Sequence, residues 1–157
     1  LNDPEVLVLD EPTAGLDPKE RVRFRNLIAG FARDKAVLLS THIVSDVESI
    51  ADRILVMRAG AIAMEGTPVE LAALAEGRVW EAEVADSEAE LLSGRLAVSN
   101  VHYRGNGSAT LRYVADAPEI PGSAPAAPGL EDFYLYMFRD DAEPAPNARK
   151  MKGGSHA

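Results

Sequence analysis

A short apolar run that ends in two adjacent carboxylates constrains the fold of this chain most strongly. Residues 6–9 read Val-Leu-Val-Leu, and Asp10 and Glu11 follow directly, with Pro4 and Pro12 on either side of the segment. This length and composition predict a strand that is buried on both faces of a parallel sheet. The two acids would then lie at the carboxyl end of the strand, which is the edge where α/β proteins bind ligands.

A helix is predicted to follow this strand. Asp17 is suited to cap its N-terminus, with Pro18 at the first helical position and Glu20 at the third. Four apolar residues then recur at helical spacing and predict one buried stripe: Phe24, Leu27, Ile28 and Phe31. A second apolar run at 36–39 and a short helical pattern at 43–50 complete a strand–helix–strand–helix order, which favours right-handed crossovers and a parallel sheet.

The next segment predicts a hairpin and one more helix. Residues 54–57 and 61–64 flank a glycine turn, as in a β-hairpin. Thr67 then begins a helix that is expected to run to about Glu76, with Gly77 as its C-terminal cap.

A change of pattern after residue 77 predicts a second, smaller α+β domain at 78–139. Its predicted elements are strands at 80–84, 98–104 and 110–114, helices at 87–92 and 130–138, and a proline-rich loop at 116–129. The final helix is expected to pack through Leu130, Phe133, Met137 and Phe138. Residues 140–157 are polar and predict a disordered tail.

The bulk composition limits the classes of partner and of chemistry. A net charge of −9 argues against nucleic acid as a partner, because phosphate binding needs a basic surface. The chain contains no cysteine, which excludes disulfides and thiolate chemistry. No apolar run approaches the roughly 18 residues of a membrane span, so a membrane contact is expected through a partner. The chain begins at Leu1 in the middle of a pattern, which we interpret as a cut edge.

The Asp10-Glu11 pair indicates a cation site. Two acids at the end of a buried strand are costly to desolvate unless a cation or water occupies the site. Mg²⁺ suits such a pair, because it is commonly held by one or two carboxylates together with phosphate oxygens and water. The pair by itself is equally compatible with an ordinary strand end before a proline turn and a capped helix.

The longer string around the pair resembles a known family. Residues 6–18 (Val-Leu-Val-Leu-Asp-Glu-Pro-Thr-Ala-Gly-Leu-Asp-Pro) are similar to the Walker B motif and D-loop of ABC ATPases, and Ser40-Thr41-His42 resembles the switch-histidine segment. The pattern of transporter members continues through Ala51-Asp52-Arg53-Ile54, Gly60, Gly66-Thr67-Pro68 and Glu70-Leu71. Leu130-Glu131-Asp132-Phe133 resembles the tail of the drug- and antibiotic-exporter (ABC-2 type) branch. The resemblance implies an α/β fold, with the C-terminal half of a P-loop NTPase-like core at 1–77.

The resemblance also implies roles for individual residues. Asp10 would hold Mg²⁺ through water, Glu11 would orient and polarise the water that attacks the γ-phosphate of ATP, and His42 would contact that phosphate. Asp17 and Gly15 would lie at the seam between two ATPase subunits. These roles agree with phosphoryl transfer, which depends on positioning and charge neutralisation.

The chain lacks three motifs that the family has before its Walker B strand: the phosphate loop, the glutamine loop and the Leu-Ser-Gly-Gly signature. It contains no Gly-Lys dipeptide and therefore no Gly-x-x-x-x-Gly-Lys-Ser/Thr phosphate loop. Leu92-Ser93-Gly94-Arg95 is not the family's signature motif, because it follows the Walker B strand and lacks the second glycine. We therefore expect a part of the ATP-hydrolysing subunit of an ABC exporter that is inactive alone. Its expected partners are a membrane permease and a second ATPase subunit, at the cytoplasmic face of the cell membrane.

Three other interpretations stay open from the sequence. The first is a soluble ABC ATPase of DNA repair or translation, which shares the Walker B and D-loop strings. The second is a non-catalytic module in which residues 78–139 serve dimerisation or regulation. The third is an unrelated α/β domain with a chance motif.

Overall fold

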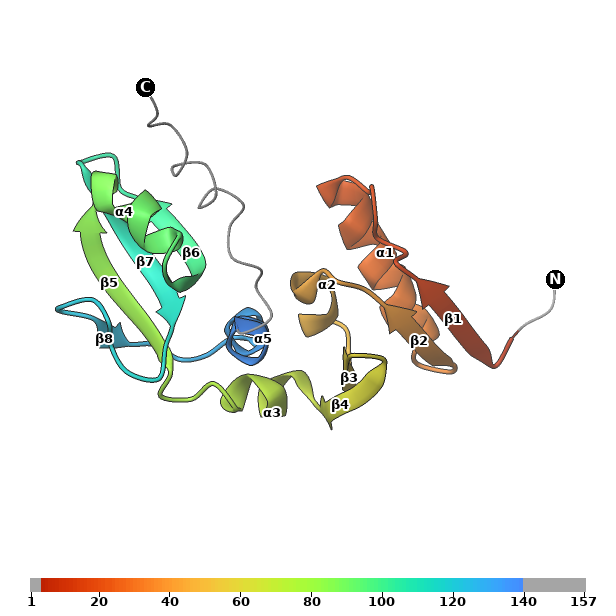
Figure 1. Cartoon of the computed structure of the whole chain (residues 1–157). Helices are drawn as coiled ribbons and strands as arrows, with labels where there is room; N and C mark the ends of the chain where they lie inside the picture. Colours follow the sequence, from red (N-terminus) through yellow and green to blue (C-terminus); the bar gives the residue numbers. More distant parts are fainter. Residues whose placement is uncertain (1–3, 140–157) are drawn as a thin grey trace, which may run out of the picture. The chain divides into compact units, whose positions relative to one another are not determined.

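The structure is a computed structural model that describes residues 4–139, so the predicted tail at 140–157 lies outside it (Figure 1). The chain divides into two compact units, of which the first ends at Leu74 and the second begins at Ala75. The sequence placed a domain boundary after residue 77, and the independence of the two domains stays a prediction. Within residues 4–139, no helix has the length and apolar character needed to cross a membrane.

A parallel strand pair connected by a helix forms the start of the first unit. Strand β1 (Val6–Asp10) pairs in parallel with β2 (Ala36–Ser40), and α1 (Pro18–Phe31) connects them. The register sets Val6 opposite Ala36 and Asp10 opposite Ser40, so the two strands end together. This arrangement confirms the parallel pairing predicted from the sequence.

The start of α1 also agrees with the sequence prediction. Asp17 caps the helix, and its Oδ1 accepts a hydrogen bond of 2.8 Å from the backbone N–H of Glu20. Pro18 occupies the first turn, where a missing N–H costs no intrahelical bond. The predicted apolar stripe is only partly buried, since Ile28 is 6% exposed but Leu27 is 55% exposed.

The prediction that the first strand is buried on both faces is wrong for this structure. Val6 and Val8 are 58% and 70% exposed, and Leu38 on β2 is 56% exposed. Successive side chains of a strand point to opposite faces, and burial on both faces needs a covering layer on each. Among the described residues, one face of the β1–β2 pair lacks such a layer.

Two short helices and a hairpin complete the first unit. Helix α2 (Val44–Glu48) precedes the antiparallel hairpin of β3 (Ile54–Arg58) and β4 (Ala61–Gly66). The hairpin turns through Ala59 and Gly60, whose φ angles are both positive at 50° and 79°. A two-residue turn of this kind matches the right-handed twist of the strands, and it confirms the predicted hairpin.

The helix after the hairpin is shorter than predicted. Thr67 is the N-cap residue of helix α3 (Pro68–Ala73). Its hydroxyl accepts a hydrogen bond from the backbone N–H of Glu70, and the Glu70 carboxylate accepts one from the backbone N–H of Thr67. The helix was expected to continue to Glu76, but it ends at Ala73 and a turn follows. Gly77 then adopts a positive φ of 71°, the conformation typical of a residue that ends a helical segment.

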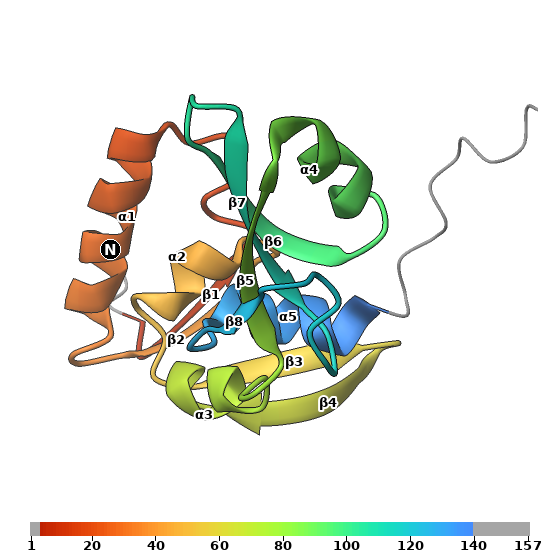
Figure 2. The ribbon, with the colours of Figure 1, turned by 90° about the vertical axis from the view of Figure 1, so that its left-hand side faces the viewer.

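The second unit is built on an antiparallel sheet with strand order β6-β7-β5-β8. Its elements in chain order are β5 (Val79–Ala85), α4 (Asp86–Ser93), β6 (Ala97–Tyr103), β7 (Ser108–Val114), β8 (Ala124–Pro125) and α5 (Leu130–Phe138). Figures 1 and 2 show both helices beside this sheet. Strand β8 was not predicted: the loop at 116–129 contains this two-residue edge strand, a position that tolerates Pro125.

The two helices cover opposite faces of the sheet. Leu111 belongs to the buried apolar cluster that includes Ala89 of α4. The next residue, Arg112, instead bonds Asp132 of α5. Because successive strand residues face opposite sides, α4 and α5 lie on different faces. Leu130 and Phe133 of α5 are 4% and 2% exposed, which confirms the predicted packing of this helix.

A buried carboxylate fixes α5 to the sheet. Asp132 is 2% exposed, and its oxygens accept hydrogen bonds from the guanidinium of Arg112, the hydroxyl of Ser99 and the backbone N–H of Gly129. Burial acts to raise the pKa of Asp132, but these hydrogen bonds outweigh it and hold the pKa below the usual value. The same contact with Asp132 raises the pKa of the Arg112 guanidinium.

We predict that Asp132→Asn destabilises the second unit by about 1–3 kcal/mol, because Arg112 loses its buried anion. Since the carboxyl pKa is lowered on folding, its stabilisation is present above the unfolded pKa of about 3.9 and is lost as the pH falls through the folded value. Urea unfolding followed by the fluorescence of Trp80, the only tryptophan, measures both effects. The neighbouring Glu131→Gln serves as control, and equal stability of the two variants at pH 7 would contradict the prediction.

Candidate functional site

The candidate site lies where β1 and β2 end side by side. The parallel register pairs Asp10, the last residue of β1, with Ser40, the last residue of β2. Glu11 and His42 lie in the segments that leave these two strands. Residues that are far apart in the sequence therefore meet at one edge, as expected for the carboxyl ends of parallel strands.

Glu11 has an unusual backbone conformation. Its φ is 44°, in the left-handed region that non-glycine residues seldom adopt. Its backbone N–H donates to the carbonyl oxygen of Ser40 at 3.1 Å and to the Ser40 Oγ at 3.2 Å. Both contacts tie the first residue after β1 to the end of β2.

The Glu11 side chain contacts His42. Its Oε1 lies 2.8 Å from the Nδ1 of His42, while its Oε2 is buried and has no hydrogen-bond partner among the described residues. A carboxylate only accepts hydrogen bonds, so the Nδ1 of His42 carries the proton in this contact. The Oε2 of Glu11 therefore keeps an unused capacity to accept hydrogen bonds.

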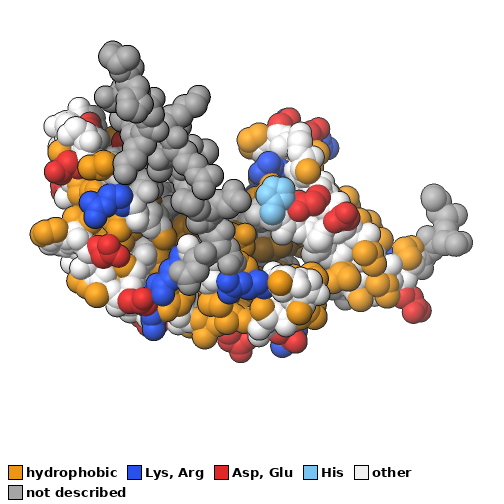
Figure 3. Space-filling view, in the orientation of Figure 1, with side chains coloured by type: hydrophobic (Ala, Val, Ile, Leu, Met, Phe, Trp, Pro, Cys, Tyr) orange, Lys and Arg blue, Asp and Glu red, His pale blue; other side chains and the backbone are white. Residues whose placement is uncertain are grey.

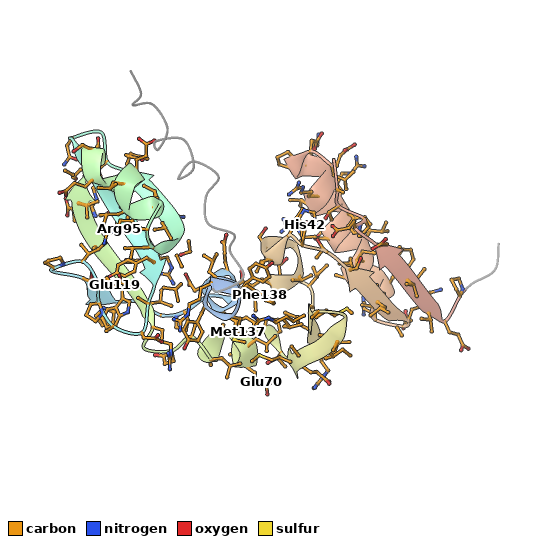
Figure 4. The ribbon with its side chains drawn as sticks, in the orientation of Figure 1. His42, Glu70, Arg95, Glu119, Met137 and Phe138 are labelled. Atoms are coloured by element: carbon orange, nitrogen blue, oxygen red, sulfur yellow. The ribbon has the colours of Figure 1, made fainter. Side chains whose placement is uncertain are left out.

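His42 is open to solvent. Its side chain is 75% exposed, compared with 37% for the side chain of Glu11. Figure 4 labels His42 on the segment after β2, and Figure 3 shows a histidine side chain at the surface with acidic side chains near it. The structure thus brings two of the predicted catalytic residues, Glu11 and His42, into direct contact at an accessible place.

Asp10 adjoins this pair. One of its carboxylate oxygens, Oδ1, accepts a hydrogen bond from the hydroxyl of Ser40. No group of three or more His, Asp or Glu side chains among residues 4–139 is arranged to enclose a metal ion. The carboxylate of Asp10 nevertheless suits Mg²⁺, which is commonly bound by one or two carboxylates with water and phosphate oxygens completing its shell.

Gly15 and Asp17 belong to the turn between β1 and α1. Gly15 has a φ of 76°, so a side chain at this position would be strained. Asp17 caps α1 as described above. The structure does not join either residue to Asp10, Glu11 or His42 by a hydrogen bond within the described part of the chain. Their predicted place at a subunit seam stays a prediction.

Two features of this edge were missed in the sequence. The hydroxyl of Ser40 forms hydrogen bonds with the Asp10 carboxylate and with the backbone N–H of Glu11, whereas His42 was the only candidate site residue predicted in that segment. This contact could have been predicted from the position of Ser40 at the end of its strand, because paired parallel strands of equal length place their last residues side by side. Thr13 is 2% exposed, and its Oγ1 has no partner among the described residues.

A polar depression on the second unit was also not predicted. It has a volume of about 280 Å³ and is lined by Glu81, Asn100, His102, Thr110 and Arg112. These side chains come from three different strands, so their proximity depends on the sheet register. Arg112 is already bonded to Glu81 and Asp132, which leaves this depression without an uncompensated charge that would indicate a ligand class.

The chain is homologous to ABC transporter ATP-binding proteins over most of its length. It is 32% identical over 149 residues to an uncharacterised ABC transporter ATP-binding protein of Synechocystis, covering 89% of this chain and 42% of that protein. It is 34% identical over 139 residues to the Nod factor export ATP-binding protein I of Burkholderia orbicola, and the match covers 87% of this chain and 44% of that protein.

A shorter match has higher identity. The energy-coupling factor transporter ATP-binding protein EcfA2 of Symbiobacterium thermophilum is 53% identical over 70 residues, which are 44% of this chain and 24% of that protein. No protein-family model matches the chain. The chain spans less than half the length of the curated relatives it matches.

We predict that Asp17→Ala lowers the stability of α1 by about 1 kcal/mol, because the N-cap acceptor is lost. Asp17→Ser should keep most of this stability, since serine supplies an equivalent oxygen. Hydrogen exchange of the Glu20 amide, the group that Asp17 accepts from, measures the difference. If the Glu20 amide exchanged as fast in Asp17→Ser as in Asp17→Ala, the negative charge of Asp17 at the helix start would stabilise α1 more than its hydrogen bond does.

Proposed function

We propose that this chain is part of the ATP-hydrolysing subunit of an ABC exporter. The observation that carries the proposal is the contact between Glu11 and His42 beside Asp10, at the joint end of β1 and β2. Homology to ABC transporter ATP-binding proteins supports the same class. The names of the Nod factor export relatives favour export as the direction of transport.

Each residue of the site has a role in this proposal. Asp10 binds Mg²⁺ through water, and Mg²⁺ when bound neutralises charge on the phosphates. Glu11 aligns the attacking water and accepts hydrogen bonds from it, using the oxygen that His42 leaves free. His42 contacts the γ-phosphate and, through its bond to Glu11, links the presence of that phosphate to the position of the water.

The proposed partners, and the separate roles of residues 1–77 and 78–139, follow from this assignment. A second ATPase subunit completes the site, with Asp17 and Gly15 at the seam, and a membrane permease receives the resulting motion at the cytoplasmic face of the membrane. Residues 1–77 supply the second half of a P-loop NTPase-like core. Residues 78–139 form an accessory domain for contact between subunits or with a partner, because among the described residues they contain no cluster of His, Asp or Glu side chains that could hold a metal ion.

We predict that this chain alone binds Mg-ATP more weakly than about 1 mM, a standard binding free energy of about −4 kcal/mol. The reason is that its 157 residues contain no Gly-Lys phosphate loop and carry a net charge of −9, which repels a triphosphate. Isothermal titration calorimetry measures the affinity. Micromolar binding would contradict the prediction and would require an unrecognised phosphate site.

We predict that Glu11→Gln, in an ATPase that contains these residues together with a phosphate loop, lowers turnover on the order of 10²–10⁴-fold, the usual contribution of a positioned base. Nucleotide binding should be nearly unchanged, because glutamine keeps the shape of the side chain, and the ATP-loaded dimer should accumulate. Steady-state hydrolysis and nucleotide occupancy measure the two effects. Glu20→Gln, on the first turn of α1, is the matched control, and normal turnover in Glu11→Gln would remove Glu11 from this role.

A further inference from the structure

Ser40 is the residue through which the two halves of the candidate site are connected. It is the last residue of β2 and lies opposite Asp10 in the parallel register. Its hydroxyl donates to the Oδ1 of Asp10 and accepts from the backbone N–H of Glu11 at 3.2 Å. Its carbonyl oxygen accepts from the same N–H at 3.1 Å.

The direction of these bonds fixes the orientation of the Asp10 carboxylate. A serine hydroxyl has a single proton, and here that proton points to Asp10 because the carboxylate can only accept. The Oδ1 of Asp10 is thereby held against β2. The second oxygen of Asp10 is the one left to bind a hydrated cation.

The same serine supports the strained backbone of Glu11. A positive φ at a non-glycine residue persists only where the surroundings stabilise it. The N–H of Glu11 has both of its acceptors on Ser40, the carbonyl oxygen and the hydroxyl, while the carbonyl oxygen of Glu11 accepts from the N–H of Ala14. Ser40 therefore contributes two of the three hydrogen bonds on this backbone. That conformation directs the Glu11 carboxylate to the Nδ1 of His42.

We propose that Ser40 is a positioning residue. Its hydroxyl sets the Asp10 carboxylate and keeps the Glu11 carboxylate against His42. Only the consequence for ATP hydrolysis rests on the proposed function; the arrangement of the three side chains does not.

The test follows the protonated nitrogen of His42 by ¹⁵N NMR on the full chain, without nucleotide. At pH 8.5 an ordinary imidazole is neutral. The bond to Glu11 then favours the Nδ1–H form over the Nε2–H form that free histidine prefers in water. His42→Gln identifies the signal among the three histidines of the chain.

We predict that Ser40→Ala shifts the ratio of the two His42 forms toward Nε2–H by about fivefold, the change that corresponds to one lost hydrogen bond. Exchange of the Glu11 amide should accelerate by a similar factor. Ser40→Thr keeps the hydroxyl and suits a strand residue, so it should retain the Nδ1–H form. Ser45→Ala, on α2, is the matched control and should change neither signal.

Two outcomes would overturn the proposal. One is an unchanged ratio in a folded Ser40→Ala protein, and the other is an equal shift in Ser40→Thr. If Ser40→Ala does not fold, Ser40→Cys replaces it, because the thiol has a similar size but donates weakly. Failure of the proposed function is separable: normal turnover in Glu11→Gln would reject the hydrolytic role and leave this NMR result standing.

Discussion

The parallel register of β1 and β2 is the constraint on which the candidate site depends. It places Asp10 opposite Ser40, and the segments leaving the two strands then bring Glu11 to His42. A shift of one residue would turn Asp10 and Ser40 to opposite faces, because side chains alternate along a strand. The chemistry of the site therefore follows from backbone pairing more than from any single side chain.

Local signals were sufficient to predict the helix starts. Asp17 and Thr67 each precede a proline and a glutamate at fixed spacing, and both cap a helix in the structure. These contacts join residues that are three apart in the chain, so the sequence contains both partners in one short window. The Ala59-Gly60 turn was predictable for the same reason, since the turn conformation is decided by the residues within it.

Contacts between distant segments could not be predicted in this way. The bonds of Ser40 to Asp10 and Glu11 depend on strand register, and the left-handed conformation of Glu11 has no sequence signal because glutamate seldom adopts it. The network of Asp132 requires two strands and a helix to meet. Proline in the loop at 116–129 argued against a strand there, yet an edge position tolerates Pro125 because its missing N–H faces away from the ladder.

The comparison of two acids separates structural from chemical roles. Asp132 is buried and bonded to Arg112, Ser99 and the backbone of Gly129, so its hydrogen-bonding capacity is used inside the fold. Glu11 has one oxygen bonded to His42 and one without a partner among the described residues. A buried, unsatisfied carboxylate oxygen costs free energy unless something outside the described residues binds it. The chemistry proposed for this chain therefore centres on the β1–β2 edge, whereas the network around Asp132 holds α5 to the sheet without a ligand.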